Sequence, residues 1–222
     1  MTHAPAGAGV RRALAEALSL AFPVECAGCR APGAALCDTC APQLAPNATR
    51  RQLPSGLLVW SGLVFDAVAA GTLRALKEDG RTGLARALAP ALAAALTAAA
   101  EGRHGLLVVP IPASRAAMRR RGYRVVELLT DRAGVAPARL LVPTRRTADQ
   151  RSLGIEARRG NVAGSLRARG GAGMDVVVVD DVVTTGATLE EAARALTAAG
   201  ARVIGAATVA ATPLRGASQT HR

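Results

Sequence analysis

The thirteen residues 176–188 constrain the fold more than any other part of this sequence. They begin with four valines, continue with Asp180 and Asp181, and end in a loop rich in threonine that contains Gly186. A short, fully apolar run is typical of a strand that is buried on both faces, as in a parallel sheet covered by helices. Apolar periodicity then predicts a helix from about residue 188 to 199. The segment therefore predicts a strand that carries two carboxylates at its C-terminal end, followed by a loop and a helix.

The same alternation of strands and helices extends over most of the chain. We expect a strand or hairpin near residues 57–65 and strands near 106–111, 139–142, 162–166, 175–179 and 203–209. Helices are expected near 11–21, 66–77, 123–133 and 188–199, and an alanine-rich helix that follows 66–77 should end near residue 99. Buried apolar strands that alternate with helices indicate the α/β class, with a parallel sheet flanked by helices.

Three regions are expected along the chain. Residues 1–55 would contain a helix, a cysteine-rich knuckle and a proline-rich linker from about 41 to 55. Residues 56–212 would form the α/β domain, with a helical lead-in to about residue 105. The polar residues 213–222 would form a disordered tail.

All four cysteines lie in one short window and form two C-x-x-C pairs. The pairs are Cys26 with Cys29, and Cys37 with Cys40. Two such turns supply four thiolates, a ligand set suited to a closed, tetrahedral, structural Zn²⁺ site. A labile or absent metal is the alternative. A redox dithiol would need only one pair.

The loop after the predicted strand has the chemistry of a phosphate site. Its main-chain amides and the helix N-terminus present donors, three threonines add hydroxyl groups, and a glycine allows close approach. The predicted phosphate-binding residues are Thr184, Thr185, Gly186, Ala187 and Thr188. The loop has no lysine, so the Walker pattern of nucleoside triphosphatases is absent.

The two carboxylates next to this loop suggest what else the ligand contains. Asp180 and Asp181 can accept hydrogen bonds from vicinal ribose hydroxyls and favour a substrate that carries Mg²⁺. A phosphate in the loop and a diol on the acids together describe a phosphoribosyl group. The alternative is a helix-capping loop beside solvated acids.

Charge and hydropathy limit the classes of binding partner and the cellular compartment that we expect for this protein. The formal net charge is +12, which favours polyanionic partners, although solvated arginine faces would give the same value. The alanine-rich stretch from Leu84 to Ala100 contains Arg86 and Pro90, so we expect a buried helix and no membrane span. The N-terminus has no signal-peptide pattern, and we expect a cytoplasmic protein.

Residues 176–188 resemble the phosphoribosyl-diphosphate (PRPP) motif of type I phosphoribosyltransferases, and the chain from about 26 to 209 resembles the ComF family (ComFC/GntX-like) of competence-associated proteins. The other matching residues are the cysteine pairs, Phe65, Asp66, Leu76, Lys77, Gly80, Val109, Pro110, Ile111, Pro112, Arg119, Arg120, Arg121, Gly122, Tyr123, Arg145, Arg146, Thr147, Gln150, Leu153, Arg158, Asn161 and Val162.

The resemblance implies a type I phosphoribosyltransferase core after a zinc knuckle. Asp180 and Asp181 would be the catalytic, ribose-contacting acids, and PRPP would bind with Mg²⁺. Residues 110–123 would be the pyrophosphate loop, and residues 144–161 a mobile cover. The arginines expected at the diphosphate are Arg119, Arg120 and Arg121, and the polar residues expected in the cover are Arg145, Arg146, Gln150, Arg158 and Asn161.

Three functions remain open at this point. The first is transfer of a phosphoribosyl group to a nitrogenous acceptor with release of pyrophosphate. Thr184 stands where 6-oxopurine transferases carry an aspartate, which weakens a role in purine salvage and leaves the acceptor unidentified. The second is a non-catalytic competence protein that binds single-stranded DNA or DNA-uptake proteins, or senses PRPP. A nucleotide-responsive regulator without turnover is the third. The oligomeric state is not predicted.

Overall fold

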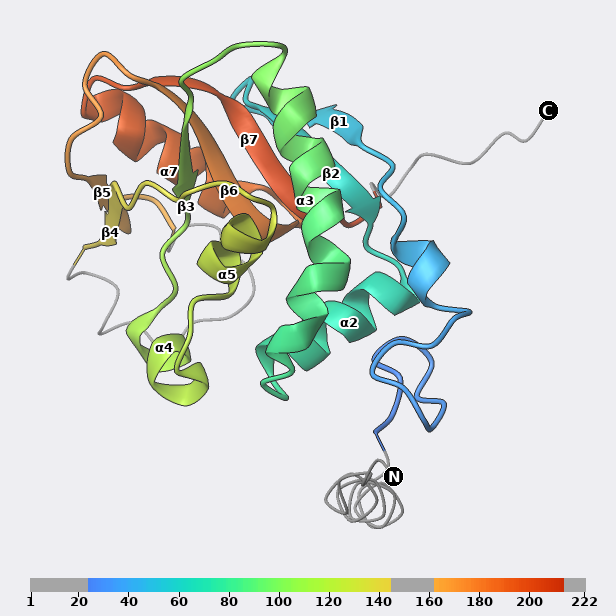
Figure 1. The fold of residues 1–222 in the computed structure, drawn as a ribbon. Helices are drawn as coiled ribbons and strands as arrows, with labels where there is room; N and C mark the ends of the chain where they lie inside the picture. Colours follow the sequence, from blue (N-terminus) through green and yellow to red (C-terminus); the bar gives the residue numbers. More distant parts are fainter. Residues whose placement is uncertain (1–23, 145–161, 214–222) are drawn as a thin grey trace, which may run out of the picture.

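A central sheet of five strands organises the chain (Figure 1). The computed structural model describes residues 24–144 and 162–213. The strands lie in the order β1-β2-β7-β6-β3, and all neighbours are parallel except β1 and β2. Their bounds are β1 Thr49–Gln52, β2 Leu58–Val64, β7 Arg202–Ala211, β6 Asp175–Val183 and β3 Leu107–Pro110. The expected α/β class, with a mostly parallel sheet flanked by helices, is confirmed.

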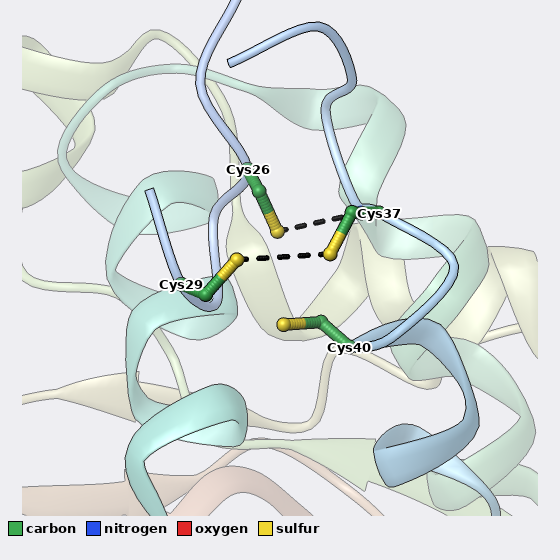
Figure 2. Close-up of side chains that lie close together, drawn as sticks. All are labelled: Cys26, Cys29, Cys37 and Cys40. Atoms are coloured by element: carbon green, nitrogen blue, oxygen red, sulfur yellow. Dashed lines mark hydrogen bonds between the residues drawn. The ribbon is translucent and has the colours of Figure 1, made fainter. Parts of the chain in front are cut away.

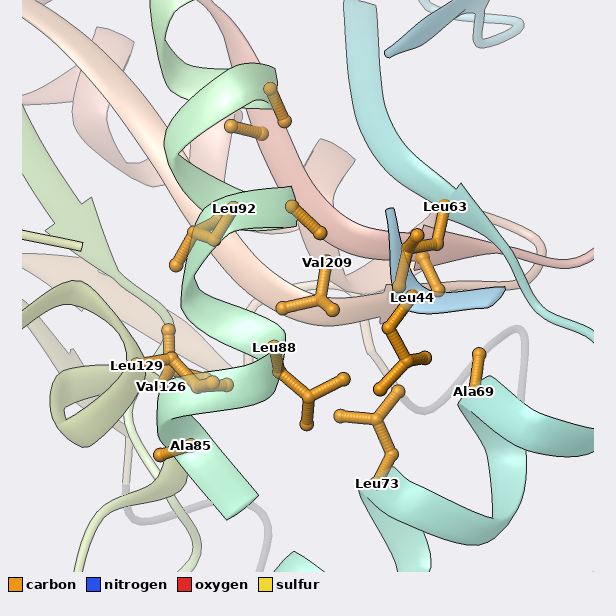
Figure 3. Close-up of a cluster of buried hydrophobic side chains, with 14 of the residues drawn as sticks. Leu44, Leu63, Ala69, Leu73, Ala85, Leu88, Leu92, Val126, Leu129 and Val209 are labelled. Atoms are coloured by element: carbon orange, nitrogen blue, oxygen red, sulfur yellow. The ribbon is translucent and has the colours of Figure 1, made fainter. Parts of the chain in front are cut away.

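Helices cover both faces of this sheet. In Figure 1, α3 (Ala85–Ala100) crosses in front of the sheet, next to α2 (Ala67–Lys77) and α5 (Val125–Arg132), and α7 (Ala187–Ala198) lies behind it. Figure 3 shows the core on the α3 side, where Leu88 and Leu92 approach Val209 of β7. A second core lies between the sheet and α7.

Strand β6 shows why its sequence has no polar alternation. Val177 and Val179 pack into the α3 core, whereas Val176 and Val178 pack into the α7 core. Successive side chains of a strand point to opposite faces, so a strand with a covered face on each side needs apolar residues at every position. The run of four valines is the consequence.

Helix α3 is the apolar stretch that the sequence analysis singled out. Together with the 3-10 turn Thr82–Leu84, it forms the one helical stretch among the described residues that is long and apolar enough to cross a membrane, Thr82–Ala100, with a mean hydropathy of 1.4. Half of its most apolar window is buried inside the structure. Helix α3 contacts β2 and β7, as expected for the core helix of an α/β domain.

The expected linker from 41 to 55 is wrong in part. Residues Ala41–Leu44 form a 3-10 helix, and Thr49–Gln52 form β1, which pairs with β2 in an antiparallel hairpin. Strand β1 is short, polar and mostly exposed, so hydrophobic periodicity gave no signal for it.

A second small sheet also departs from expectation. The strand predicted over 162–166 begins only at its last residue: β5 is Leu166–Ala168, and it pairs antiparallel with β4, Leu141–Pro143. The predicted helix over 11–21 and most of the predicted tail lie outside the described residues.

Candidate functional site

The two carboxylates lie inside strand β6, not after its end. We expected the strand to stop at residue 179, but it continues to Val183. Asp180 pairs with Thr208 of β7 in the ladder, so the main chain of β6 is held in the sheet at the position of the acids. The carboxylates are therefore carried by a rigid element at the C-terminal edge of the parallel sheet, where α/β proteins bind their ligands.

Asp180 and the predicted phosphate loop form one hollow. Its cavity volume is about 30 Å³, so the hollow is a small, shallow depression that opens to solvent. The hollow is lined by Asp180 and residues Val182 to Leu189, which include all five predicted phosphate-binding residues. Thr184, Thr185 and Thr188 are exposed to solvent, whereas Gly186 is buried. The structure therefore brings the first acid and the loop together around one open space.

Gly186 sets the shape of this loop. It is the N-cap of α7 and has φ +86°, in the left-handed region that glycine adopts without strain. The helix then starts at once: the N–H of Glu190 donates to the carbonyl of Gly186. The N–H of Ala187 makes a long hydrogen bond of 3.4 Å to Oγ1 of Thr185. The N-terminal amides of α7 therefore face the hollow with little competition from the chain itself.

Asp180 has an unusual electrostatic setting. Burial, reinforced by the neighbouring charge of Asp181, raises the pKa of Asp180 to about 8. Its Oδ1 accepts the N–H of Asp181 at 2.8 Å, and the charge of Lys77 acts in the opposite direction on the pKa. Desolvation disfavours the ionised form of a carboxyl group. Asp180 therefore holds a proton at neutral pH until a cation or donor approaches.

Asp181 is paired with a lysine from a different part of the chain. Nζ of Lys77, the last residue of α2, lies 2.7 Å from Oδ2 of Asp181, and both side chains are mostly buried (24% and 16% exposed). The α2 helix begins at Asp66, whose carboxylate caps it by accepting the N–H of Ala69. The two adjacent acids thus have different surroundings: one lines the hollow and the other holds an ammonium group.

The predicted pyrophosphate loop is helical over the arginines. Arg119, Arg120 and Arg121 end α4, Arg115–Arg121, which is capped by Ser114 and stopped by Gly122 at φ +77°. The expected role of these arginines at the diphosphate stays a prediction; their main chain is helical. The Ser114 hydroxyl accepts the N–H of Ala117 at 3.1 Å, a capping pattern that explains the helix.

Two of these arginines contact the end of α2. Arg121 Nη2 lies 3.1 Å from Oε1 of Glu78, and Arg120 Nη2 lies 3.4 Å from Oε2. The Nε of Arg121 is buried and has no acceptor among the described residues. The Tyr123 hydroxyl donates to the carbonyl of Leu76. Helix α4 and the turn after it therefore dock on the α2 terminus beside Asp181, but they do not line the hollow.

The residues expected in the mobile cover lie outside the described residues. They are Arg145, Arg146, Gln150, Arg158 and Asn161.

The four cysteines converge as predicted (Figure 2). Their sulfur atoms all lie within 4.8 Å of one another, and the Sγ atoms of Cys29 and Cys37 are 3.6 Å apart. Tetrahedral zinc with Zn–S bonds of about 2.3 Å requires sulfur separations of about 3.8 Å. The donor set and its spacing therefore fit a structural Zn²⁺ held by Cys26, Cys29, Cys37 and Cys40.

Main-chain amides prepare one sulfur to act as a thiolate. The N–H of Cys29 is the main factor that lowers the pKa of Cys26 to about 6, and the N–H of Cys37 also donates to this sulfur at 3.3 Å. Burial raises the pKa of Cys40. Hydrogen bonds to the charged form favour it, and this pattern is expected of a knuckle that folds around an ion.

The cysteine knuckle is built against α2. At Gly71 a Cβ atom would lie 2.2 Å from the carbonyl oxygen of Ala27, so the helix and the knuckle touch through their backbones. At Gly28 a Cβ atom would lie 2.7 Å from Sγ of Cys40. Arg81 adds a hydrogen bond of 2.9 Å to the carbonyl of Ala35. The same helix that supports the knuckle delivers Lys77 to Asp181 at its other end.

Sequence reasoning missed part of this site. Lys77 was named only as part of the family resemblance and was given no role, and Glu78 was not considered. Arg51 of β1 was assigned to a linker, but its guanidinium donates to the carbonyl of Thr184 at 2.9 Å. The sequence signals for Lys77 were its place among the residues of the family resemblance and its position at the end of a capped helix.

One family model matches the chain. The model described as "Phosphoribosyl transferase domain" matches residues 116–220, which include α4, the acids and the threonine loop. No protein of curated function matches the sequence.

Solved structures of several phosphoribosyltransferases resemble the chain at low identity. An adenine phosphoribosyltransferase has a TM-score of 0.40 and 17% identity, covering 78% of this chain and 89% of its own. The orotate phosphoribosyltransferase of Mycobacterium tuberculosis H37Rv has a TM-score of 0.34 and 16% identity, and the match covers 77% of this chain and 81% of that enzyme. The orotate phosphoribosyltransferase of Aeropyrum pernix has a TM-score of 0.33 and 17% identity, and the match covers 78% of this chain and 91% of that enzyme. Residues 116–220 are thus similar to a phosphoribosyltransferase domain, and a four-cysteine cluster precedes them in the chain.

Proposed function

We propose that this protein binds PRPP and transfers its phosphoribosyl group to a nitrogenous acceptor, releasing pyrophosphate. The observation that carries the proposal is the single hollow formed by Asp180 and the Thr184–Thr188 loop at the N-terminus of α7. A phosphate monoester and a sugar diol, a few bonds apart in one ligand, match a donor-rich loop and an adjacent carboxyl group.

The loop is suited to the 5-phosphate. The amides at the start of α7 and three exposed threonine hydroxyls can donate to phosphate oxygens, and the helix dipole favours a negative charge there. Among the described residues, the lining of the hollow contains no lysine or arginine, so main-chain and hydroxyl donors would carry this recognition. Such donors fix the position of an anion without a flexible side chain.

The acids are suited to the ribose. Asp180 can accept a hydroxyl hydrogen when ionised and donate its own proton when neutral, because its pKa lies close to the working range. Asp181 is held by Lys77, which fixes the carboxylate and adds a positive charge beside the sugar. The pair can therefore orient the diol and hold C1 of the sugar in place for reaction.

The transfer breaks the bond between C1 and the diphosphate oxygen and forms a bond from C1 to the acceptor nitrogen. Positive charge develops on the sugar and negative charge on the leaving pyrophosphate. Asp180, once ionised, stabilises the first. Arg119 and the partly buried Arg121 lie on the helix next to the α2 terminus and would stabilise the second. As the new bond forms, the acceptor nitrogen loses its proton to the departing pyrophosphate or to solvent.

The acids also fit the expected Mg²⁺. Asp181 already accepts a cationic group at 2.7 Å, and Asp180 gains its negative charge readily when a cation approaches. When bound, Mg²⁺ neutralises the diphosphate and makes it a better leaving group.

The decisive experiment measures pyrophosphate release from PRPP with Mg²⁺, with and without a panel of nitrogenous bases. We expect acceptor-dependent release in the wild type, loss of it in Asp180→Asn and Asp181→Asn, and retention in Asp175→Asn. Asp175 is a matched control because it lies at the opposite end of the same strand. Tight PRPP binding without release on any acceptor would contradict transfer and leave the protein as a PRPP sensor.

Binding of single-stranded DNA, in a role linked to DNA uptake, is the alternative. Its support is the net charge of +12 and the exposed arginines of α4, such as Arg115 and Arg119. The aromatic side chains argue against a stacking platform, because Trp60 is buried and Tyr123 is bonded to the main chain of α2. DNA retention that falls steeply with salt, and that survives Asp180→Asn, would support this role; weak binding that does not respond to salt would contradict it.

A further inference from the structure

The β1–β2 hairpin lies against the phosphate loop on one face only. Arg51, Leu53 and Ser55 each contact the loop or the first turn of α7, and they are spaced two residues apart. Arg50 and Gln52, on either side of Arg51, are exposed, whereas Arg51 is half-buried and Leu53 is buried. The side chains of Arg51 and Leu53, two residues apart in an extended segment, point to the same side, toward the loop; Ser55 lies in the following turn and contributes its main-chain N–H.

Arg51 makes the most specific of these contacts. Its Nη2 donates to the carbonyl of Thr184 at 2.9 Å, and its Nη1 lies 3.4 Å from the carbonyl of Thr212, the residue that follows β7. Burial lowers the pKa of the guanidinium, and its Nε has no acceptor within the part of the chain that the structure describes. There, its partners are carbonyl oxygens and no carboxylate. Within residues 24–144 and 162–213, therefore, no carboxylate neutralises the positive charge of Arg51.

The other two contacts hold the same loop from both sides. The side chain of Leu53 fills the space above Gly186, where a Cβ atom would lie 2.5 Å from Leu53 Cδ1. The N–H of Ser55 donates to Oε1 of Glu190, in the first turn of α7, at 2.9 Å. The loop is thus fixed at its start by Arg51, at its turn by Leu53 and at the helix by Ser55.

We propose that the hairpin is a clamp that holds the Thr184–Thr188 loop in its anion-binding conformation, and that Arg51 is the positioning residue of this clamp for ligands with a terminal phosphate monoester. This inference rests on the proposed function for the identity of the ligand. Arg51 does not line the hollow; it acts through the Thr184 carbonyl.

Two physical effects follow from this arrangement. By holding the Thr184 carbonyl, Arg51 fixes the peptide planes of the loop, and these planes decide where the neighbouring amides point. It also places a positive charge behind a site for an anion. Both effects act on the phosphate of the ligand, and neither acts on a part of the ligand that lies far from the loop.

The binding experiment compares Arg51→Gln and Arg51→Lys with Arg50→Gln, the exposed neighbour on the opposite face. The probes are PRPP, ribose 5-phosphate and Mg²⁺-pyrophosphate, measured by calorimetry. We expect Arg51→Gln to weaken ribose 5-phosphate and PRPP about tenfold, as for one lost charge-assisted contact. Arg51→Lys should recover part of the loss. Mg²⁺-pyrophosphate should bind equally to all variants, because it lacks the 5-phosphate that the clamp serves.

A ligand-free measurement keeps the clamp testable if the proposed function fails. Hydrogen exchange at the amides of residues 186–188 should be about tenfold faster in Arg51→Gln than in Arg50→Gln. Equal exchange, or equal loss of all three probes, would overturn the proposal. A wild type that binds none of the probes would contradict the PRPP function, and the exchange rates would still decide on the clamp. If Arg51→Gln does not fold, Arg51→Lys takes its place in both comparisons.

Discussion

The partly buried carboxyl group of Asp180 should make the stability of this protein fall as the pH rises. Its pKa is about 8 in the folded protein and 3.8 in an unfolded chain. Between these values the folded protein keeps a proton that the unfolded chain has lost, so each pH unit favours the unfolded state by up to about 1.4 kcal/mol. The substitution Asp180→Asn removes the titration and keeps the shape of the side chain.

The expected gain can be worked out from the shift. Four pH units give an upper limit of about 5 kcal/mol, and partial access of solvent to Asp180 reduces this to about 2–3 kcal/mol. At pH 4 the two proteins should differ little from titration, and by pH 8 the variant should be more stable by this amount. Urea unfolding at pH 5, 6, 7 and 8, at constant ionic strength, gives the free energy of unfolding directly.

The control is Asp175→Asn, which makes the same chemical change on the same strand. The side chain of Asp175 is 28% exposed and pairs with Arg202 at 2.5 Å, so this substitution removes an ion pair and should not stabilise the protein. If the stability of Asp180→Asn ran parallel to that of the wild type from pH 5 to 8, Asp180 would be ionised at neutral pH, and the reasoning about its surroundings would be refuted.

Three further predictions concern the supports of the site. Lys77→Met should move the titration of Asp180, followed by carbon NMR of its carboxyl group, to higher pH, because Lys77 lowers that pKa; an unchanged midpoint would contradict the role of the lysine. Gly71→Ala should lower the free energy of unfolding by about 1–3 kcal/mol, because the added methyl group meets the Ala27 carbonyl, whereas Gly83→Ala, where a Cβ meets nothing within 4 Å, should change it little. Purified protein should hold one zinc ion per chain by elemental analysis, and chelation should lower the melting temperature; a metal-free protein of equal stability would show that the cluster needs no metal.

Local sequence was sufficient for the parts of the site that are continuous in the chain. The buried strand, the threonine loop and the start of α7 follow one another directly, so the valines, Gly186 and the helical periodicity each predict their own element. The paired cysteines predicted their convergence in the same way, because each C-x-x-C turn positions two sulfurs locally. The residues that belong to the hollow were therefore predictable, apart from the exact end of β6.

Other features depended on contacts between distant segments. The β1 strand is polar and short, and it exists because β2 offers it a free edge. The arginines of α4 looked like a phosphate-binding loop, but a serine cap and a terminal glycine make them helical, and Glu78 pairs with two of them. The arginine-rich sequence predicts that the segment binds an anionic group, but it does not predict that this group is the carboxylate of Glu78.

The sequence by itself therefore determined the α/β class, the cysteine cluster and the threonine loop before α7, because each is encoded by residues next to one another. Only the tertiary structure decided that Lys77 pairs with Asp181, that Asp180 is buried enough to hold its proton, and that Arg51 holds the loop from behind. Ion pairing and desolvation depend on distances in space, and these distances are set by how α2 and the hairpin pack against the sheet.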